Sequence, residues 1–427
     1  MIPILKQNEV TMEEILSRDD PTVNVSETVS AILADVRKNG DDALIRYARE
    51  FDRVELSALE VTAEEIAQAI EQTEPEFLDI LKQAAENIRT FHRQQVRNSF
   101  ILTEKPGVVM GQRVQPIENV GIYVPGGTAA YPSTVLMDSI PAKLAGCKQI
   151  VMVTPPGKDG CVPAPILAAA SIAGVDRIFK VGGAQAVGAL AYGTQSVPKV
   201  DKIVGPGNAY VAEAKRQVFG LVSIDMIAGP SEILVIADGT CDAGIVAADL
   251  LSQAEHDKNA SAVLVTDSEV LAEAVRQELE KQIPLLPRAE IARTSIDKNG
   301  KIIVTETLER AIDISNALAP EHLELCVDKP FDYLESIRHA GSVFLGKHCP
   351  EALGDYLAGP NHTLPTSGTA RFSSPLSVDD FVKKSQYTYF TEDALKQVSD
   401  QIAVFARREG LEAHARSALI RFEEGRL

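Results

Sequence analysis

Short runs of aliphatic and β-branched residues alternate with longer amphipathic stretches through the middle of the chain. The runs predict strands at 120–124, 149–153, 177–181, 200–204, 232–237, 262–266, 302–304, 323–327 and 342–345. Helical spacing of the apolar positions lies between these runs, at 132–146, 208–219, 242–257, 268–282 and 306–318. Such alternation predicts an α/β fold in which helices cover the faces of parallel sheets.

The two ends of the chain have a different pattern, with apolar residues at helical spacing and few strand signals. Thr11 with Glu14 and Thr62 with Glu65 match the capping box that begins many helices. Gly40 follows Arg37-Lys38-Asn39 and has the position of a helix stop. We therefore expect helices in roughly the first hundred residues and again in about the last fifty.

Length and composition point to a soluble enzyme with more than one core. The chain has 427 residues, of which 45% are hydrophobic and 24% are charged. Its net charge of −18 opposes binding to a phosphate backbone, so we expect no nucleic-acid partner. The sequence contains no apolar run long enough to cross a membrane, and its start lacks a basic segment followed by an apolar one.

The cysteines indicate a reducing compartment. There are five, at 147, 161, 241, 326 and 349, and none forms a Cys-x-x-Cys motif. An odd number of widely spaced cysteines favours free thiols over a disulfide framework. We therefore expect a cytoplasmic protein.

Histidine and carboxylate residues gather in a few short polar segments that suggest a metal centre. Gln253 and His256 are three residues apart on an expected helix and share a face. Asp355 and His362 lie in a stretch rich in Gly and Pro. Either pair alone is also compatible with a polar helix surface or a turn, and glutamine is an uncommon zinc ligand. A metal site is the hypothesis that joins them.

Two further pairs complete the set of chemical candidates. Glu321 and His322 stand at the entrance of the strand 323–327, where they form either an acid/base pair or a solvated loop. Glu409 and His414 would point about 140° apart on one continuous helix. Gly410 offers a break that turns both side chains toward one place.

Three glycine-rich loops each follow an expected strand and open a helix. They are Pro125-Gly126-Gly127, Gly182-Gly183-Ala184-Gln185 and Gly205-Pro206-Gly207-Asn208. Backbone N–H groups at such positions often bind the phosphates of a dinucleotide. None of the loops completes Gly-x-Gly-x-x-Gly, so tight turns without a ligand explain them equally well.

Taken in order, these segments closely resemble the histidinol dehydrogenase family over essentially the whole chain. The matching motifs are Tyr123-Val124-Pro125-Gly126-Gly127, Gly182-Gly183-Ala184-Gln185-Ala186, Gly205-Pro206-Gly207-Asn208, the run from Ile224 to Glu232, Gln253-x-x-His256, Ala319-Pro320-Glu321-His322, Gly354-Asp355-Tyr356, Gly359-Pro360-Asn361-His362, and Glu409-Gly410-Leu411 with His414. The resemblance implies oxidation of L-histidinol to L-histidine through L-histidinaldehyde, with two NAD⁺ reduced.

The resemblance also implies a role for each candidate residue. It assigns one zinc ion per subunit to Gln253, His256, Asp355 and His414, and NAD contacts to Tyr123, Gln185 and Asn208. It assigns substrate contacts to Ser231, Gln253, His256, His322, Asp355, His362, Glu409 and His414. Glu321 and His322 are implied as the catalytic acid/base pair.

The implied architecture is a homodimer with shared active sites, two incomplete Rossmann-like domains, and small helical terminal domains exchanged between subunits. On this basis we expect an N-terminal helical segment at 1–24, a first domain at 25–122 and 232–374 with the zinc and catalytic residues, a second domain at 123–231 with the NAD contacts, and a helical tail at 375–427.

Three other functions are compatible with parts of the pattern. A dehydrogenase of another small alcohol, such as a sulfonated diol, could keep the zinc and the Glu-His pair, but Glu409 and His362 favour the imidazole substrate. A zinc hydrolase would not need the glycine loops to bind a dinucleotide. Binding of NAD by the protein would therefore argue against this function. A binding protein without catalysis would need no acid/base pair.

Overall fold

The computed structural model describes residues 1–17, 24–126 and 130–423. These fall into two compact units, which we describe separately. The first comprises Met1–Gln95 and Ile117–Phe381, and the second comprises Val96–Pro116 and Val382–Leu427. The expected α/β class is confirmed, because both large sheets are parallel and carry helices on their faces.

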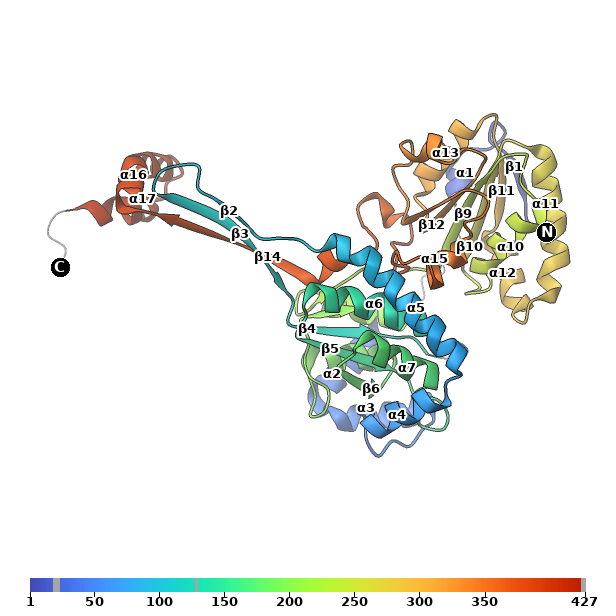
Figure 1. The fold of residues 1–427 in the computed structure, drawn as a ribbon, viewed down its shortest axis with the longest axis horizontal. Coiled ribbons are helices and arrows are strands. Elements are labelled where there is room, and N and C mark those ends of the chain that lie inside the picture. Colours follow the sequence, from blue (N-terminus) through green and yellow to red (C-terminus); the bar gives the residue numbers. More distant parts are fainter. Residues whose placement is uncertain (18–23, 127–129, 424–427) are drawn as a thin grey trace. The chain divides into compact units, whose positions relative to one another are not determined.

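A six-stranded parallel sheet in the first unit has the order β1-β11-β10-β9-β12-β13 (Figure 1). The strands are β1 (Ile4–Lys6), β9 (Glu232–Ala237), β10 (Ser261–Thr266), β11 (Lys301–Val304), β12 (His322–Cys326) and β13 (Ser342–Leu345).

Alternate residues of β9 point to opposite faces of this sheet and pack into two different hydrophobic cores. Ile233 and Val235 pack toward α10 (Ala243–Ala254), α11 (Glu269–Gln282) and α12 (Ala289–Asn299). Leu234 and Ile236 pack toward α1 (Met12–Leu16) and α13 (Leu308–Leu318).

A five-stranded parallel sheet in the same unit has the order β6-β5-β4-β7-β8. The strands are β4 (Asn119–Tyr123), β5 (Gln149–Thr154), β6 (Arg177–Lys180), β7 (Lys202–Val204) and β8 (Ser223–Ile224). One face is covered by α4 (Ala63–Gln72), α5 (Pro75–His92), α6 (Pro132–Ala145) and α7 (Ala164–Ala173). The other is covered by α2 (Ser26–Asn39), α3 (Asp41–Tyr47), α8 (Gly183–Tyr192) and α9 (Ala209–Val218).

The helical turns of the first eighty residues begin where the sequence predicts. Thr11 and Thr62 form complete capping boxes with Glu14 and Glu65. Gly40 follows the last residue of α2, with φ +54. Shorter pieces complete this unit: a π-helix at Ala48–Asp52, α14 (Phe331–Leu334), α15 (Glu351–Tyr356), and 3-10 turns at Arg93–Gln95, Ile283–Leu285, Thr369–Arg371 and Val378–Phe381.

The helices of the N-terminal region pack on a different sheet from the one expected from the sequence. The segment 25–122 was expected beside 232–374, but α2 to α5 pack on the five-stranded sheet, to which β4 itself belongs. The segment 1–24 was expected to be helical, but Ile4–Lys6 pairs with β11; residues 18–23 lie outside the described residues. Apolar periodicity shows that a helix buries one face, but it does not show which sheet receives that face.

The second unit is a three-stranded antiparallel sheet with a helical hairpin. The sheet order is β14-β3-β2, with β2 at Phe100–Leu102, β3 at Val108–Pro116 and β14 at Val382–Phe390. Strands β3 and β14 pair along their full length, from Val382 with Pro116 to Phe390 with Val108 (Figure 1). Helices α16 (Glu392–Arg408) and α17 (Glu412–Leu419) follow, with a 3-10 turn at Ile420–Phe422.

The tail 375–427 was expected to be helical throughout, and β14 corrects that expectation. Most of β14 is exposed, in the run Lys383-Lys384-Ser385-Gln386, so neither face carries the alternating apolar residues that indicate a strand. The break at Gly410 is confirmed. Glu409 is the last residue before the turn, Gly410 has φ +79, and Leu411 precedes α17.

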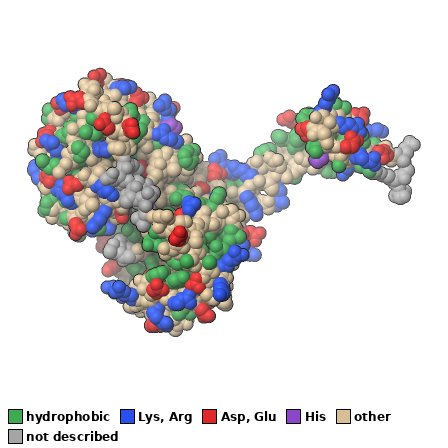
Figure 2. Space-filling view, turned by 180° about the vertical axis from the view of Figure 1, so that it is seen from behind, with side chains coloured by type: hydrophobic (Ala, Val, Ile, Leu, Met, Phe, Trp, Pro, Cys, Tyr) green, Lys and Arg blue, Asp and Glu red, His purple; other side chains and the backbone are tan. Residues whose placement is uncertain are grey.

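The surface of the described residues carries charges of both signs. Figure 2 shows lysine and arginine interspersed with aspartate and glutamate on the face in view, without a continuous basic stripe over its described part. No helix in the described ranges is both long and apolar enough to cross a bilayer.

Candidate active site

The catalytic candidates lie at the amino ends of two neighbouring strands. Glu232 begins β9 and His322 begins β12, and these strands are adjacent. The chain runs from β9 outward through β10 to β11, and later returns to β12 on the other side of β9. Ligands of open α/β sheets usually bind at the carboxyl edge of such a switch point. At the carboxyl edge of this sheet, Lys347 instead forms ion pairs with Asp238 and Asp328.

The backbone of Glu232 orients both members of the predicted acid/base pair. Its N–H donates to Glu321 Oε2 at 2.9 Å, and its carbonyl oxygen lies 2.8 Å from His322 Nδ1. A carbonyl oxygen only accepts hydrogen bonds, so Nδ1 carries a proton. In the neutral ring, Nε2 is therefore the basic nitrogen. His322 Nε2 is buried without a hydrogen-bond partner in the described structure.

Burial and neighbouring charges adjust the protonation of this pair. Burial raises the pKa of Glu321 to about 7, although the charge of His322 opposes the rise. Burial alone would lower the pKa of His322, but the charges of Glu321, Glu351 and Asp355 outweigh it, so that pKa is raised. Both side chains are almost inaccessible to solvent, with His322 3% and Glu321 7% exposed. Groups that exchange protons near neutral pH suit general acid/base catalysis.

Asp355 lies beside His362, as the hypothesis of one centre requires. His362 Nδ1 is 3.4 Å from Asp355 Oδ1. Burial disfavours ionisation of Asp355, but the hydrogen bond and charge of His362 outweigh that effect and lower the pKa of Asp355 to about 2. The same contact raises the pKa of His362 against the effect of burial. Asp355 is therefore an ionised carboxylate at neutral pH.

The loop that carries His362 is anchored to helices of the five-stranded sheet. Asn87 Nδ2 of α5 donates to Leu357 O at 2.7 Å. Asn361 Nδ2 donates to Met137 O at 2.7 Å, and Thr363 Oγ1 donates to Asp138 Oδ1 at 2.8 Å; both acceptors belong to α6. These bonds fix the backbone on both sides of His362.

Gln253 and His256 approach the same centre from the end of α10. Gln253 lies in the last turn, is 2% exposed, and hydrogen-bonds to the carboxyl group of Glu351. His256 follows the helix, and its backbone N–H donates to Gln253 O at 3.1 Å. Burial lowers the pKa of His256, although the charge of Asp355 opposes this. His256 is therefore neutral at pH 7, the form in which histidine binds metals.

Glu351 belongs to this centre and was missed by the sequence analysis. It is 2% exposed, and its Oε1 lies 3.8 Å from His322 Nε2. One ligand atom each from His322, Glu351 and Asp355 lies within 4.8 Å of the other two. Ser252 Oγ donates to Glu351 Oε2 at 2.9 Å. The spacing of four residues between Glu351 and Asp355 was a usable signal, because such residues share a helix face.

The residues present fit a bound metal ion. Three buried polar atoms around Asp355 have no hydrogen-bond partner among the described residues, namely His322 Nε2, Glu351 Oε1 and His362 Nε2. Such groups need an occupant to satisfy them. The nearby donors are a neutral imidazole, an ionised carboxylate and an amide, and zinc binds nitrogen and carboxylate oxygen readily. Three of the four residues predicted as ligands, Gln253, His256 and Asp355, lie near one another in this centre.

The other predicted substrate and metal residues are distributed as follows. Ser231 immediately precedes β9 and is partly exposed beside the centre. Glu409 and His414 belong to the second unit, at the turn between α16 and α17, where both are exposed.

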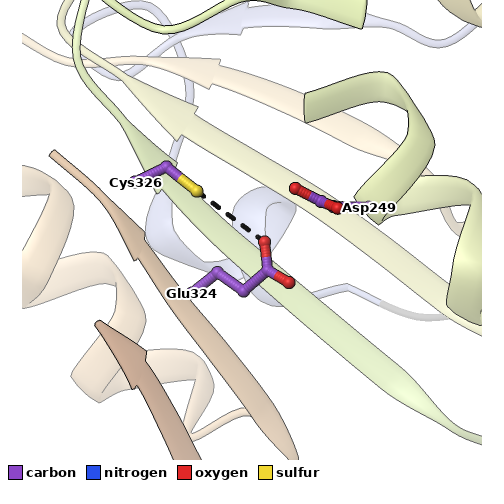
Figure 3. A group of neighbouring side chains, drawn as sticks. All are labelled: Asp249, Glu324 and Cys326. Carbon is purple, nitrogen blue, oxygen red and sulfur yellow. Dashed lines mark hydrogen bonds between the residues drawn. The ribbon is translucent and has the colours of Figure 1, made fainter. Parts of the chain in front are cut away.

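A second group of potential ligands lies further along β12. Figure 3 shows the side chains of Glu324 and Cys326, on that strand, beside Asp249 of α10. Burial and the charge of Asp249 raise the pKa of Glu324 to about 9, and burial raises the pKa of the Cys326 thiol. A metal ion bound here would have to displace these protons.

The predicted NAD contacts lie at the carboxyl edge of the five-stranded sheet, next to the switch point between β4 and β7. Tyr123 ends β4, and its hydroxyl accepts a hydrogen bond from Gly183 N at 3.0 Å. Gln185 is buried in the first turn of α8. Asn208 caps α9 and accepts from Tyr210 N and Val211 N. Gly127 lies outside the described residues.

Comparisons with known proteins show similarity over nearly the whole chain. The family model described as histidinol dehydrogenase matches residues 16–422. The chain is 56% identical to histidinol dehydrogenase of Bacillus cereus over 99% of its own length and 96% of that protein. It is 56% identical to the Clostridium acetobutylicum enzyme over 93% of each chain. The crystal structure of the Elizabethkingia anophelis enzyme superposes with a TM-score of 0.93, at 40% identity and 98% coverage of both chains.

Proposed function

This chain belongs to the histidinol dehydrogenase family, and we propose that it converts L-histidinol to L-histidine through L-histidinaldehyde with a zinc ion and two NAD⁺. Membership makes it an NAD-dependent oxidoreductase of histidine biosynthesis that acts on an alcohol and an aldehyde intermediate. The observation that carries the finer proposal is the placement of His322 and Glu321 on the backbone of Glu232, directly beside Asp355.

In the proposed metal site, Gln253, His256 and Asp355 hold zinc together with His414. When bound, the ion supplies a fixed template for the imidazole and amine of the substrate. Burial of Gln253 and the neutral state of His256 support this assignment. Ser231, His362 and Glu409 complete the substrate contacts in the proposal.

His322 acts as the base in both oxidations. Its Nε2 accepts the hydroxyl proton of histidinol while a hydride leaves the same carbon for the nicotinamide ring. Between the two oxidations, a water molecule adds to the aldehyde. The carboxylate of Glu321 accepts a proton from that water while His322 returns its proton to the aldehyde oxygen, so the hydrate forms and the ring is neutral again. The hydrate then loses a proton to His322 and a second hydride to NAD⁺. The contact of each side chain with Glu232 keeps both aimed at one place.

Tyr123, Gln185 and Asn208 are the proposed NAD contacts. Their position at a switch point of a parallel sheet supports this role. The proposed catalytic residues lie at the amino edge of the six-stranded sheet, and the proposed cofactor residues lie at the carboxyl edge of the five-stranded sheet.

We further propose a cytoplasmic homodimer with shared sites. His414 and Glu409 belong to a small unit with exposed apolar side chains, including Phe405 at 69% and Ile101 at 64%. Such surfaces on a small unit favour association with a second copy. All five cysteines are unpaired, which supports a reducing compartment.

The stoichiometry of the purified protein tests this function. We expect two NADH per histidinol consumed, one zinc per subunit, and no accumulation of free aldehyde. One NADH per histidinol with aldehyde in solution would reject the two-step reaction. Oxidation of a sulfonated diol in preference to histidinol would select the related dehydrogenase, and hydrolysis without NAD binding would select a zinc hydrolase.

A further inference from the structure

Two buried carboxyl groups lie directly behind the catalytic centre. Glu324 is 0% exposed and two residues from His322, so both side chains are on the face of β12 that looks toward α10. Asp249 is on α10, one helical turn before Gln253. One ligand atom each from Asp249, Glu324 and Cys326 lies within 4.8 Å of the other two (Figure 3).

This proximity requires the two carboxyl groups to share a proton. Two carboxylates at such a distance, away from water, repel each other strongly, and one of them retains its proton. A hydrogen bond joins the side chains of Glu324 and Asp249, and burial raises the pKa of Asp249 as well. At neutral pH the pair therefore retains at least one proton.

Glu324 also caps the helix that carries Asp355. Its Oε1 accepts the backbone N–H of Glu351, the first residue of α15, at 2.6 Å. The residue before this helix is Pro350, which provides no side-chain cap. Free N–H groups at a helix start need such acceptors. Glu324 supplies one from a different element, and this ties α15 to β12.

We propose that Asp249 and Glu324 are positioning residues that hold α10, β12 and α15 in one arrangement and thereby set the distances among Gln253, His322 and Asp355. The pair joins α10 to β12 through the shared proton, and β12 to α15 through the cap. The groups that face Glu324 are Asp249 from α10, Glu351 from α15 and Cys326 from its own strand. The role of the three positioned residues rests on the proposed function; the shared proton does not.

The first experiment follows the melting temperature of the full-length protein against pH, with and without added zinc, for wild type, Glu324→Gln and Asp249→Asn. The folded state holds the proton of Glu324 up to a pKa of about 9, whereas the unfolded chain releases it near pH 4.5. Wild-type stability therefore declines across that window. Each amide variant lacks one of the two titrating carboxyl groups and the repulsion between them, so its melting temperature should gain on wild type as pH rises toward about 9.

The second experiment measures zinc affinity by titration against a competing chelator. Glu324→Ala removes both the cap and the shared proton and should weaken zinc binding by roughly 10–100-fold, the usual effect of losing a supporting group. Cys326→Ala is the matched control, since it removes only the long contact of the thiol with Glu324 Oε2 and leaves the bonds of Glu324 to both helices; its affinity should stay within about twofold.

The outcomes separate this inference from the proposed function. The inference would be overturned if the difference in melting temperature between wild type and each amide variant did not change with pH, because no proton would then be shared. Equal zinc affinity of Glu324→Ala and Cys326→Ala would overturn the positioning role. If Glu324→Ala does not fold, the zinc affinity of Glu324→Gln should exceed that of wild type above about pH 9, and equal affinities there reject the role. If the wild-type protein does not oxidise histidinol, the proposed function is rejected, but the dependence of melting temperature on pH still tests the shared proton.

Discussion

Glu232 O lies 2.8 Å from His322 Nδ1, so a backbone carbonyl fixes the tautomer of the proposed catalytic base. A backbone acceptor cannot be removed by substitution, but its partner can be replaced by a side chain that keeps the contact. A substitution at His322 can therefore remove the basic nitrogen of the ring and still keep the hydrogen bond to Glu232 O.

His322→Asn should retain the fold and abolish most activity. The asparagine amide can still donate to Glu232 O, but nothing remains at the position of Nε2 to accept a proton. We expect kcat to fall by roughly 10²–10⁴-fold for both the alcohol and the aldehyde, the usual scale for a lost base. Steady-state rates with each substrate measure this, with circular dichroism as the control for folding. Near-normal oxidation of either substrate would show that His322 is not the base in that step.

Glu321→Gln should separate the two oxidations. The amide retains an oxygen to accept from Glu232 N, but it cannot take a proton from water. Oxidation of supplied histidinaldehyde should therefore fall more than oxidation of histidinol, by roughly 10²-fold or more. Single-turnover NADH formation with each substrate gives the comparison. Equal losses in both steps would remove water activation from the role of Glu321.

Much of the fold follows from local pattern, and much of the centre does not. Except for the two-residue β8 (Ser223–Ile224), the strands from β4 to β13 were predicted within a few residues, because each is a short apolar run between helical stretches. The capping boxes at Thr62 and Thr11 were predicted because the reciprocal bonds involve only neighbours in sequence. Strand β14 was missed because its apolar and polar residues do not alternate and most of its side chains are exposed.

Within the centre, the resemblance supplied the residue types and the structure supplied their surroundings. Glu232 contributes backbone atoms, which no side-chain motif reveals. Glu351 and Glu324 act through contacts with residues far away in sequence, such as Ser252 and Asp249. Long-range contacts of this kind depend on how β12 and α10 pack, and local periodicity carries no information about them.

Gly205→Ala should disturb the proposed NAD-binding loop Gly205–Asn208 more than Gly220→Ala disturbs its own turn. Gly205 has φ +111, and a Cβ there would lie 2.1 Å from Tyr123 O. Gly220 is the matched control, with φ +98 and no described atom within 4 Å of its Cβ. Both alanines incur backbone strain of about 1–3 kcal/mol, but only the first also displaces Tyr123. We expect a raised KM for NAD and a larger loss of Tm in Gly205→Ala. Equal effects of the two substitutions on KM for NAD would contradict the prediction.

Asp138 should make stability depend on pH in the mildly acidic range. Burial raises its pKa to about 7, although Thr363 and His362 oppose the rise. A carboxyl group whose pKa is raised on folding stabilises the protein at low pH, and that contribution is lost from about pH 4 up to pH 7. Asp138→Asn lacks the titration, so its unfolding free energy should improve relative to wild type across this window by about 1–4 kcal/mol. Urea unfolding at several pH values measures the difference, and a constant offset would show that Asp138 is ionised throughout.

His414 should complete the metal site of the partner subunit. The residue belongs to a unit separate from Gln253, His256 and Asp355, and it is exposed there. A C₂ dimer that exchanges this unit builds two equivalent sites, each with ligands from both chains. Loss of one of four ligands should disable a site, so His256→Ala and His414→Ala should each be nearly inactive as pure dimers.

Mixing the two inactive variants tests the sharing directly. After unfolding and refolding of an equal mixture, about half of the dimers contain one chain of each variant. In each mixed dimer, one site carries both lesions and the other combines the intact His256 of one chain with the intact His414 of the other. About a quarter of wild-type activity should therefore return. If His414 served its own chain, every site would keep one lesion. No recovery in a mixture shown by mass spectrometry to contain heterodimers would then reject the shared site.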